Sequence, residues 1–378
     1  MSIHDFDDIR PFLPEELPAV YDRLLADPEF QHVLSYIYKD TPLPQLEQLI
    51  RSCHTNLDFQ LHVVYPMLKH LIDTAATSLT ANFSALADGH DRQYTFVSNH
   101  RDIVLDSAFL SVVLHDNGFN TVEIAIGDNL LIRPWIRDLV RINKSFIVQR
   151  SLPPRQLLVA SANMSRYMHF CINQKHENIW IAQREGRAKD SDDRTQESVL
   201  KMMAMGGDLR QLNIVPLAIT YEYDPCDYLK AQEFQNKRDI EGFRKSPQDD
   251  LDNMRTGIFG PKGKIHYHAA PCINDWLDTL PADLPKTEYF RQVAAHIDRE
   301  IHRHYHLYPG NYAAADMLTG THAYAAHYTP EQQQQFEAYL QQKLAMVQLA
   351  HPDIPYLRER MLTMYANPVF NHEKANQA

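Results

Sequence analysis

The residues best suited to chemistry lie in one short segment, YTFVSNHRDIVLDSAFL, at residues 94–110. Its β-branched and aromatic start predicts a strand that ends before Asn99 and His100, and the apolar residues after Asp102 predict a helix. A histidine at the end of such a strand lies where open α/β sheets bind their ligands. Because its unperturbed pKa is about 6.5, histidine can act as a general base near neutral pH.

Two carboxylates compete for the role of partner to His100, namely Asp102 and Asp106. On one continuous helix, the six-residue step from His100 to Asp106 turns the side chain by about 240°, so the two cannot share a helix face. We therefore expect His100 to precede the helix and Asp106 to lie in its first turn. A carboxylate there can fix the tautomer of the imidazole and stabilise its cation. Asp102 is expected to cap the helix and remains the alternative partner.

This segment resembles the first motif of the glycerolipid acyltransferases, which include glycerol-3-phosphate and lysophosphatidate acyltransferases. The family motif is Asn-His, four residues and Asp after a strand; here five residues separate His100 from Asp106. Three later segments resemble the other family motifs in the same order: SFIVQR at 145–150, IWIAQREGRAKD at 179–190 and NIVPLAITYEYDP at 213–225. The third is one residue shorter than the family pattern, and Arg184 replaces its proline.

The resemblance implies an enzyme that transfers a fatty acyl group from acyl-CoA or acyl carrier protein to a hydroxyl of glycerol 3-phosphate or a lysophosphatidate-like acceptor. His100 would be the general base, Asp106 would orient it, and no covalent enzyme intermediate would form. Arg150, with Arg187 or Arg184, would hold the phosphate of the acceptor, because guanidinium groups bind phosphate through two parallel hydrogen bonds. This chemistry requires no cofactor and no metal ion. The implied substrate-binding residues are Asn99, Arg101, Arg150, Arg184, Glu185, Gly186, Arg187 and Pro216.

Two other functions fit the same residues. An O-acyltransferase for a non-phosphate acceptor, such as an amino-acid lipid, would use the arginines for another anion. A non-catalytic relative that binds lipid or an acyl carrier would have lost the chemistry. A serine hydrolase is disfavoured, because the sequence has no Gly-x-Ser-x-Gly elbow.

Hydrophobic periodicity indicates the elements that position these residues. The pattern is helical up to about residue 85, and then β-rich segments alternate with helical ones. This alternation predicts an α/β fold with a mixed, largely parallel sheet covered by helices. Strands are expected at 94–98, 121–126, 145–149, 179–183, 214–221 and 264–273. We expect three parts: an N-terminal helical region over 1–88, an α/β acyltransferase core over 89–280 and a C-terminal helical extension over 281–378.

Charge and hydropathy limit the partners and the location. The 378 residues carry a net charge of −11, which disfavours nucleic acid as a partner. No segment approaches the roughly 18 apolar residues of a membrane span, and the acidic N-terminus does not resemble a signal peptide. We therefore expect a cytoplasmic location, with a peripheral contact on the inner face of the cytoplasmic membrane. Residues 133–155 are locally basic, which predicts either a site for a small anion or a solvated basic helix face. The cations are Arg133, Arg137, Arg141, Lys144, Arg150 and Arg155.

Histidines form two further clusters, His302, His304 and His306 in one and His266 and His268 in the other. Alternate residues of a helix point about 200° apart, so the first three cannot converge on a metal ion within a helix. We interpret them as a polar helix end, where the cationic form would favour the helix dipole. His266 and His268 share one face of a strand and are interpreted as half-buried strand residues.

Overall fold

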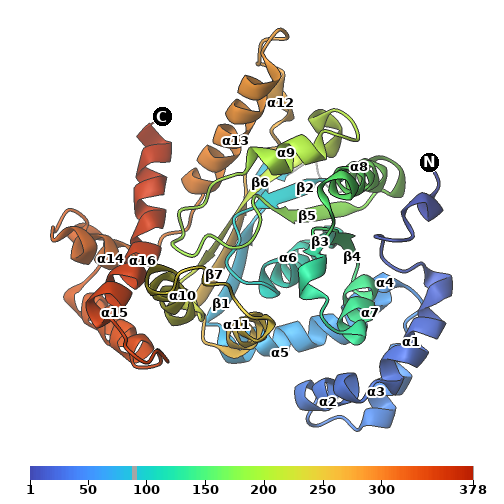
Figure 1. The fold of residues 1–378 in the computed structure, drawn as a ribbon, viewed down its shortest axis with the longest axis horizontal. Helices are drawn as coiled ribbons and strands as arrows, with labels where there is room; N and C mark the ends of the chain where they lie inside the picture. Colours follow the sequence, from blue (N-terminus) through green and yellow to red (C-terminus); the bar gives the residue numbers. More distant parts are fainter. Residues whose placement is uncertain (87–91, 378) are drawn as a thin grey trace.

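The computed structural model describes residues 1–86 and 92–377 (Figure 1). Within these residues, seven strands form one sheet in the order β1-β7-β6-β2-β5-β3-β4. The strands are β1 (Ser78–Asn82), β2 (Thr95–Ser98), β3 (Val122–Gly127), β4 (Ser145–Val148), β5 (Asn178–Ala182), β6 (Ile214–Tyr221) and β7 (Lys264–Ala269).

The pairing of the strands confirms the predicted mixed, largely parallel sheet. Strands β4, β3, β5, β2 and β6 pair in parallel, β7 pairs antiparallel with β6, and β1 pairs in parallel with β7. Strand β6 is buried along its whole length. Its sequence is apolar rather than alternating because helices cover both faces of the sheet. Every strand predicted from the sequence is present.

Helices precede, separate and follow these strands. The N-terminal group comprises α1 (Leu17–Ala26), α2 (Pro28–Ile37), α3 (Leu43–Arg51), α4 (Asn56–Phe59) and α5 (Tyr65–Ala75). Helices between the strands are α6 (Leu105–Asp116), α7 (Pro134–Ile142), α8 (Pro154–Phe170), α9 (Glu197–Met203), α10 (Asp227–Asp239) and α11 (Pro247–Phe259). The C-terminal group comprises α12 (Asn274–Leu277), α13 (Lys286–Arg303), α14 (Pro309–Thr319), α15 (Pro330–Leu344) and α16 (Ile354–Gln377). In the described part of the chain, no helix is both long enough and apolar enough to cross a membrane.

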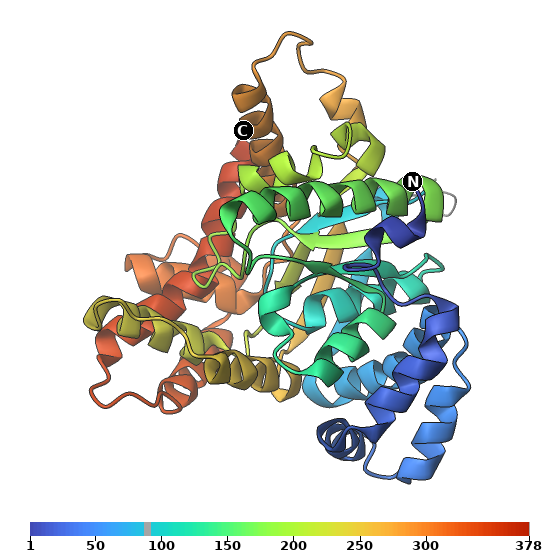
Figure 2. The ribbon, with the colours of Figure 1, turned by 45° about the vertical axis from the view of Figure 1, so that its right-hand side comes forward.

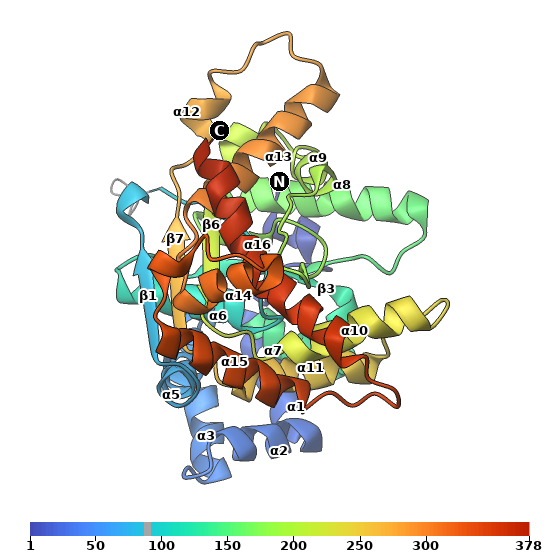
Figure 3. The same ribbon diagram turned by 90° about the vertical axis from the view of Figure 1, so that its left-hand side faces the viewer.

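The helices divide the molecule into packed layers. Helices α5 and α6 cover one face of the sheet, and α8, α9 and α13 cover the other. The N-terminal helices α1 to α4 form a separate cluster that includes Ile142 of α7. The C-terminal helices lie at the opposite side of the molecule (Figure 2). There α16 packs along α14, α10 and α13 (Figure 3).

The structure differs from the predicted division of the chain in two places. Strand β1 lies within residues 1–88, where helices were expected; its sequence, SLTAN, has too few β-branched and aromatic residues to signal a strand. Helix α13 lies in the predicted C-terminal extension, yet its apolar side packs in the core beneath the sheet. The predicted boundary between residues 88 and 89 lies outside the described residues. The charged segment 229–262 folds mainly as α10 and α11.

The two histidine clusters, interpreted separately from the sequence, meet in the structure. Ring centroids of His266 and His306 lie 5.0 Å apart, and those of His268 and His304 lie 4.4 Å apart. Burial, together with the facing histidines, lowers the pKa of His266 and of His268 to about 4. Burial also lowers the pKa of His302 to about 4, so the expected cationic form is wrong for this residue. The described residues include no group of side chains suited to a metal ion.

This cluster predicts that acid destabilises the protein. Histidines in the unfolded chain take up protons near pH 6.5, whereas His266 and His268 in the folded chain do so only near pH 4. The unfolded chain therefore binds more protons across this window, and the free energy of unfolding falls as the pH falls through it. We expect thermal denaturation to show a lower Tm at pH 5 than at pH 7. The double variant His266→Gln/His268→Gln should reduce this difference by at least about 3 °C.

The matched control replaces His32 and His351, which are exposed, by glutamine. It should leave the pH dependence of the Tm unchanged. An equal effect of both double variants would contradict the assignment to the His266–His268 pair.

Candidate active site

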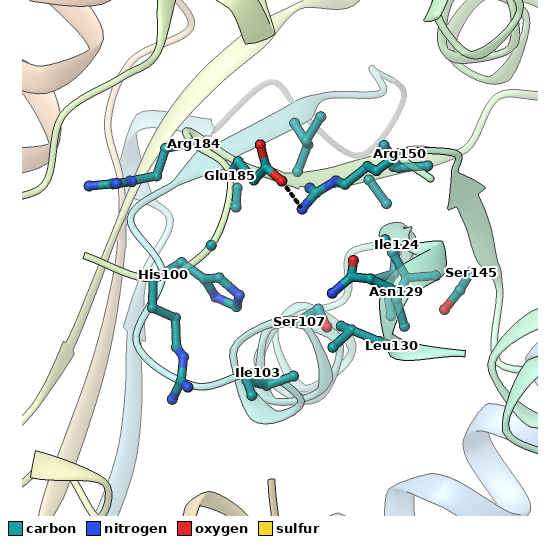
Figure 4. Close-up of a pocket in the computed structure, with 18 of the residues that line it drawn as sticks. His100, Ile103, Ser107, Ile124, Asn129, Leu130, Ser145, Arg150, Arg184 and Glu185 are labelled. Atoms are coloured by element: carbon teal, nitrogen blue, oxygen red, sulfur yellow. Dashed lines mark ion pairs between the residues drawn. The ribbon is translucent and has the colours of Figure 1, made fainter. Parts of the chain in front are cut away.

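A cavity of about 720 Å³ lies at the carboxyl ends of the parallel strands (Figure 4). Its wall is built by the segments that follow β2, β3, β4 and β5, and by residues of α7, α8 and α11. Carboxyl ends of parallel strands meet at one edge of a sheet, which is where ligands bind in open α/β sheets. The structure therefore brings the segments of the first three sequence motifs to one place.

His100 and Asp106 form a buried pair at the edge of this cavity. Nδ1 of His100 lies 2.8 Å from Oδ2 of Asp106, and the Asp106 side chain is fully buried. The same oxygen accepts hydrogen bonds from the backbone N–H groups of Arg101, at 2.6 Å, and Asp102, at 3.1 Å. Asp106 lies in the first turn of α6 and His100 precedes that helix, as the rotation argument predicts. The additional residue of the motif is accommodated in the loop between them.

Asp102, the alternative partner, has a different set of contacts. Its Oδ1 accepts hydrogen bonds from the backbone N–H groups of Val104, at 2.9 Å, and Leu105, at 2.8 Å. These donors belong to the start of α6, so Asp102 caps this helix. Burial, and then the charge of Asp106, raise the pKa of the Asp102 carboxyl. The carboxylate that contacts His100 is therefore Asp106.

The imidazole of His100 points into the cavity, towards Ser107 and Asn129 (Figure 4). Its side chain is only 13% exposed, and its ring packs edge-on against Trp180 of β5, with centroids 5.5 Å apart. Since Nδ1 is engaged by Asp106, Nε2 is the ring nitrogen available to take a proton from a substrate. The sequence analysis did not identify Trp180 as part of this site, because nothing in an apolar strand distinguishes its indole from core residues.

Charged groups from the second and third motifs line the opposite side of the cavity. Arg150 forms an ion pair of 3.6 Å with Glu185 (Figure 4). A Cβ atom at Gly127 would lie 2.5 Å from Oδ1 of Asn129 and 3.4 Å from the guanidinium of Arg150, so it would clash with Asn129. Gly186 has a φ of 66°, a conformation that glycine adopts without strain. The guanidinium of Arg184 points away from His100, although its residue lines the cavity.

Arg187, which the sequence analysis selected, lines the cavity and donates from Nη2 to the side-chain oxygen of Asn253 on α11, at 3.1 Å. Two further cations, Lys189 and Lys245, were not selected from the sequence. Both line the cavity and pair with the buried carboxylate of Glu233 on α10. Burial lowers the pKa of Lys189 to about 8, even though Glu233 acts in the opposite direction. Lys245 could not be identified from the sequence because only tertiary packing brings the α10–α11 segment over the cavity.

Three of the predicted substrate-binding residues do not line the cavity. Asn99 bridges to β6 through its amide, which pairs with the backbone N–H and C=O of Ile219 at 2.8 Å each. Arg101 is buried in an ion pair of 2.5 Å with Asp193. Pro216 is buried within β6, in register with Val97 of β2. The contacts of these three residues hold the loop or the sheet, and their role in substrate binding stays a prediction.

The remaining wall of the cavity is apolar. It is contributed by the end of β3 and by facing sides of α7, α8 and α9, through Ile124, Ile136, Val140, Leu157, Val199 and Met202. Apolar and cationic side chains in one cavity suit an amphipathic ligand with an anionic head and a hydrocarbon chain. His100 lines the same cavity.

Comparison with known proteins agrees with this chemistry. Residues 81–220 match the sequence model of the family described as Acyltransferase, and this confirms the resemblance found in the motifs. The crystal structure of the 1-acyl-sn-glycerophosphate acyltransferase PlsC from Thermotoga maritima is similar, with 10% sequence identity and a TM-score of 0.38. That similarity covers 76% of this chain and 96% of the PlsC chain. No curated protein matches the sequence.

Proposed function

We propose that the chain moves a fatty acyl group from a thioester to the hydroxyl of glycerol 3-phosphate or a lysophosphatidate-like acceptor. The match of residues 81–220 to the acyltransferase family model supports this proposal. The donor is acyl-CoA or acyl carrier protein. The observation that carries the proposal is the His100–Asp106 pair at a cavity that is lined by both cationic and apolar side chains.

In the proposed reaction, the acceptor hydroxyl transfers its proton to Nε2 of His100 while its oxygen attacks the thioester carbonyl. The tetrahedral intermediate then collapses to the ester, and the thiol leaves with the proton returned from His100. Asp106 stabilises the imidazolium and keeps its charge. Such general-base catalysis is typically worth about 10²–10⁴-fold. No group of the protein becomes acylated.

The cationic wall holds the phosphate of the acceptor in this proposal. Arg187 follows β5, the neighbour of β2, and Arg150 follows β4 at the edge of the sheet. Lys189 and Lys245 add charge to the same cavity. Fixing the phosphate holds the acceptor hydroxyl near Nε2 and so removes orientational freedom before the reaction. Arg184 contributes through its charge only, since its guanidinium points away from His100.

We further propose that the rim of the cavity contacts an anionic membrane surface, which fits a peripheral location at the inner face of the cytoplasmic membrane. Leu158 and Val159 are 64% and 69% exposed and follow Leu157 of the cavity wall. Exposed Arg133, Arg137 and Arg155 belong to the basic segment 133–155. Apolar side chains together with basic ones favour binding at the surface of an anionic bilayer.

The first test concerns the base and the products. His100→Ala should lower turnover by about 10³-fold, and Asp106→Asn by about 10²-fold, because the base and its orienting group are lost. Asp102→Asn is the matched control and should stay within about twofold, since asparagine also caps helices. Thiol release from acyl-CoA and from acyl carrier protein would be measured with glycerol 3-phosphate, lysophosphatidate and an amino-acid lipid, with product identification by mass spectrometry.

The outcomes of that test separate the candidate functions. Transfer only to the amino-acid lipid would favour a non-phosphate acceptor. A wild-type protein that binds acyl donors without turnover would favour the non-catalytic relative. Unchanged turnover in His100→Ala would overturn the assignment of the base.

The second test concerns the phosphate. Arg150→Gln should raise the KM for the phosphorylated acceptor by about 10-fold or more with a smaller change in kcat, because charge-assisted hydrogen bonds are lost. Steady-state kinetics at saturating donor would measure both constants. Arg137→Gln, an exposed residue of the same basic segment, is the control and should leave KM unchanged. Equal KM values for the phosphorylated acceptor in both variants would show that Arg150 does not bind the phosphate.

The third test concerns the membrane. Leu158→Ser/Val159→Ser should weaken co-sedimentation with vesicles containing anionic phosphatidylglycerol by about 10-fold or more, because buried apolar area is lost. The control Met205→Ser/Ile240→Ser alters side chains that are 42% and 51% exposed elsewhere on the surface. If the two double variants bind vesicles equally well, the rim of the cavity is not the contact surface.

A further inference from the structure

The two carboxylate oxygens of Asp106 differ in the hydrogen bonds that they accept. Oδ2 receives His100 and two backbone N–H groups, whereas Oδ1 is buried and has no hydrogen-bond partner among the described residues. A buried carboxylate oxygen without a donor is costly, because it has lost its hydration without replacement. A donor should therefore lie within reach of Oδ1.

One buried hydroxyl meets this need. The hydroxyl of Tyr221, at the end of β6, also lacks a hydrogen-bond partner among the described residues. Tyr221 and Tyr267 occupy diagonal positions on the same face of the β6–β7 pair, where Tyr221 is in register with Ile265 and Ile219 with Tyr267. The hydroxyl of Tyr267 donates to the backbone carbonyl of Asp106 at 2.9 Å. Tyr267 therefore reaches the first turn of α6, and Tyr221 projects from the same face of the sheet beside it.

The hydroxyl of Tyr221 and the carboxylate of Asp106 interact electrostatically. Burial raises the pKa of Tyr221 well above its ordinary value, and Tyr267 and the Asp106 carboxylate raise it further. Tyr221 consequently remains a neutral donor at every physiological pH. Tyr221 and Tyr267 belong to the apolar cluster between the sheet and α6, from which water is excluded.

We propose that Tyr221 is a positioning residue of the acyl transfer, whose hydroxyl donates to Oδ1 of Asp106 and so fixes the carboxylate that orients His100. This inference rests on the proposed function, in which His100 is the base. Tyr221 touches neither substrate nor the reacting atoms, since it is absent from the residues that line the cavity. The network then has a donor for each oxygen of Asp106.

The ionisable groups around this carboxylate determine the sign of the expected effect. His100 faces it from the loop after β2, Asp102 and the guanidinium of Arg101 act on it from the same loop, and Tyr221 and Tyr267 face it from β6 and β7. Removing the Tyr221 hydroxyl leaves the negative charge of Asp106 less compensated. The proton on His100 is then held more tightly, and the pKa of His100 rises.

The experiment compares Tyr221→Phe with Tyr267→Phe. Both remove one buried hydroxyl from the same face of the sheet, but only the first removes a donor to the carboxylate. In Tyr221→Phe we expect kcat to fall by about 10-fold with KM within about twofold, and the acid limb of the kcat/KM profile to move up by about half a pH unit or more. In Tyr267→Phe the acid limb should stay in place. NMR titration of the His100 ring measures its pKa in both variants without reference to turnover.

Three results would overturn the inference. The first is an unchanged His100 pKa in Tyr221→Phe, and the second is an equal shift in both variants. The third is a crystal structure of the wild-type protein with Oη of Tyr221 more than about 3.5 Å from Oδ1 of Asp106, a measurement that needs no variant. Failure of the proposed function is distinguishable, because the wild-type protein would then transfer no acyl group to a glycerol 3-phosphate or lysophosphatidate acceptor, whereas the NMR titration and the crystal structure test the contact of Tyr221 with Asp106 without turnover.

Discussion

The buried carboxylate of Asp106 is the interaction on which the rest of the site depends. A fully buried charge is tolerated only where donors surround it, and here they come from the His100 ring and two successive backbone N–H groups of the preceding loop. Its place in the first turn of α6 adds the favourable end of the helix dipole. The shape of the loop, the start of the helix and the orientation of the imidazole therefore have one common cause. A loop with one more residue than the family motif can still surround the carboxylate with donors. Asp102 caps the helix, while Asp106 accepts hydrogen bonds from the backbone N–H groups of the loop.

The surrounding structure restrains the loop that carries these donors. Arg101, next to His100 in the chain, is held by the buried carboxylate of Asp193, which also accepts a hydrogen bond of 2.8 Å from the hydroxyl of Tyr305. Lys230 of α10 donates to the backbone carbonyl of Arg101. Tyr305 follows α13 in the chain, so the C-terminal part of the molecule supports the loop after β2 through buried polar contacts. Such contacts are costly to break singly, because the remaining partner would stay buried without compensation. The C-terminal helices therefore help to hold the loop of the first motif in place.

Sequence reasoning succeeded where a local pattern carries the physical constraint. Apolar runs predict the parallel strands because helices cover both faces, and helix rotation alone places Asp106 after a loop rather than on one face with His100. It failed where the constraint is tertiary. Arg101 is a cation next to His100 in the chain, yet the direction of its side chain is decided by Asp193, which lies 92 residues away in sequence. The meeting of β7 histidines with those after α13, and of Lys245 with the cavity, follows equally from packing between distant segments.

The electrostatics of the cavity explain how a protein of net charge −11 can hold an anion. Charges beyond about 10 Å are screened by salt, so the groups that line the cavity decide its potential. Arg150, Arg184, Arg187, Lys189 and Lys245 line it, against the carboxylates of Glu185 and Asp250. Glu233 is shared by Lys189, Lys237 and Lys245, so it cannot neutralise all of them. Burial first, and then the neighbouring lysines, lower the pKa of Lys189. A positive charge on this side chain therefore costs free energy. An anionic ligand bound in the cavity would compensate the positive charge of these side chains and so lower the cost of burying it.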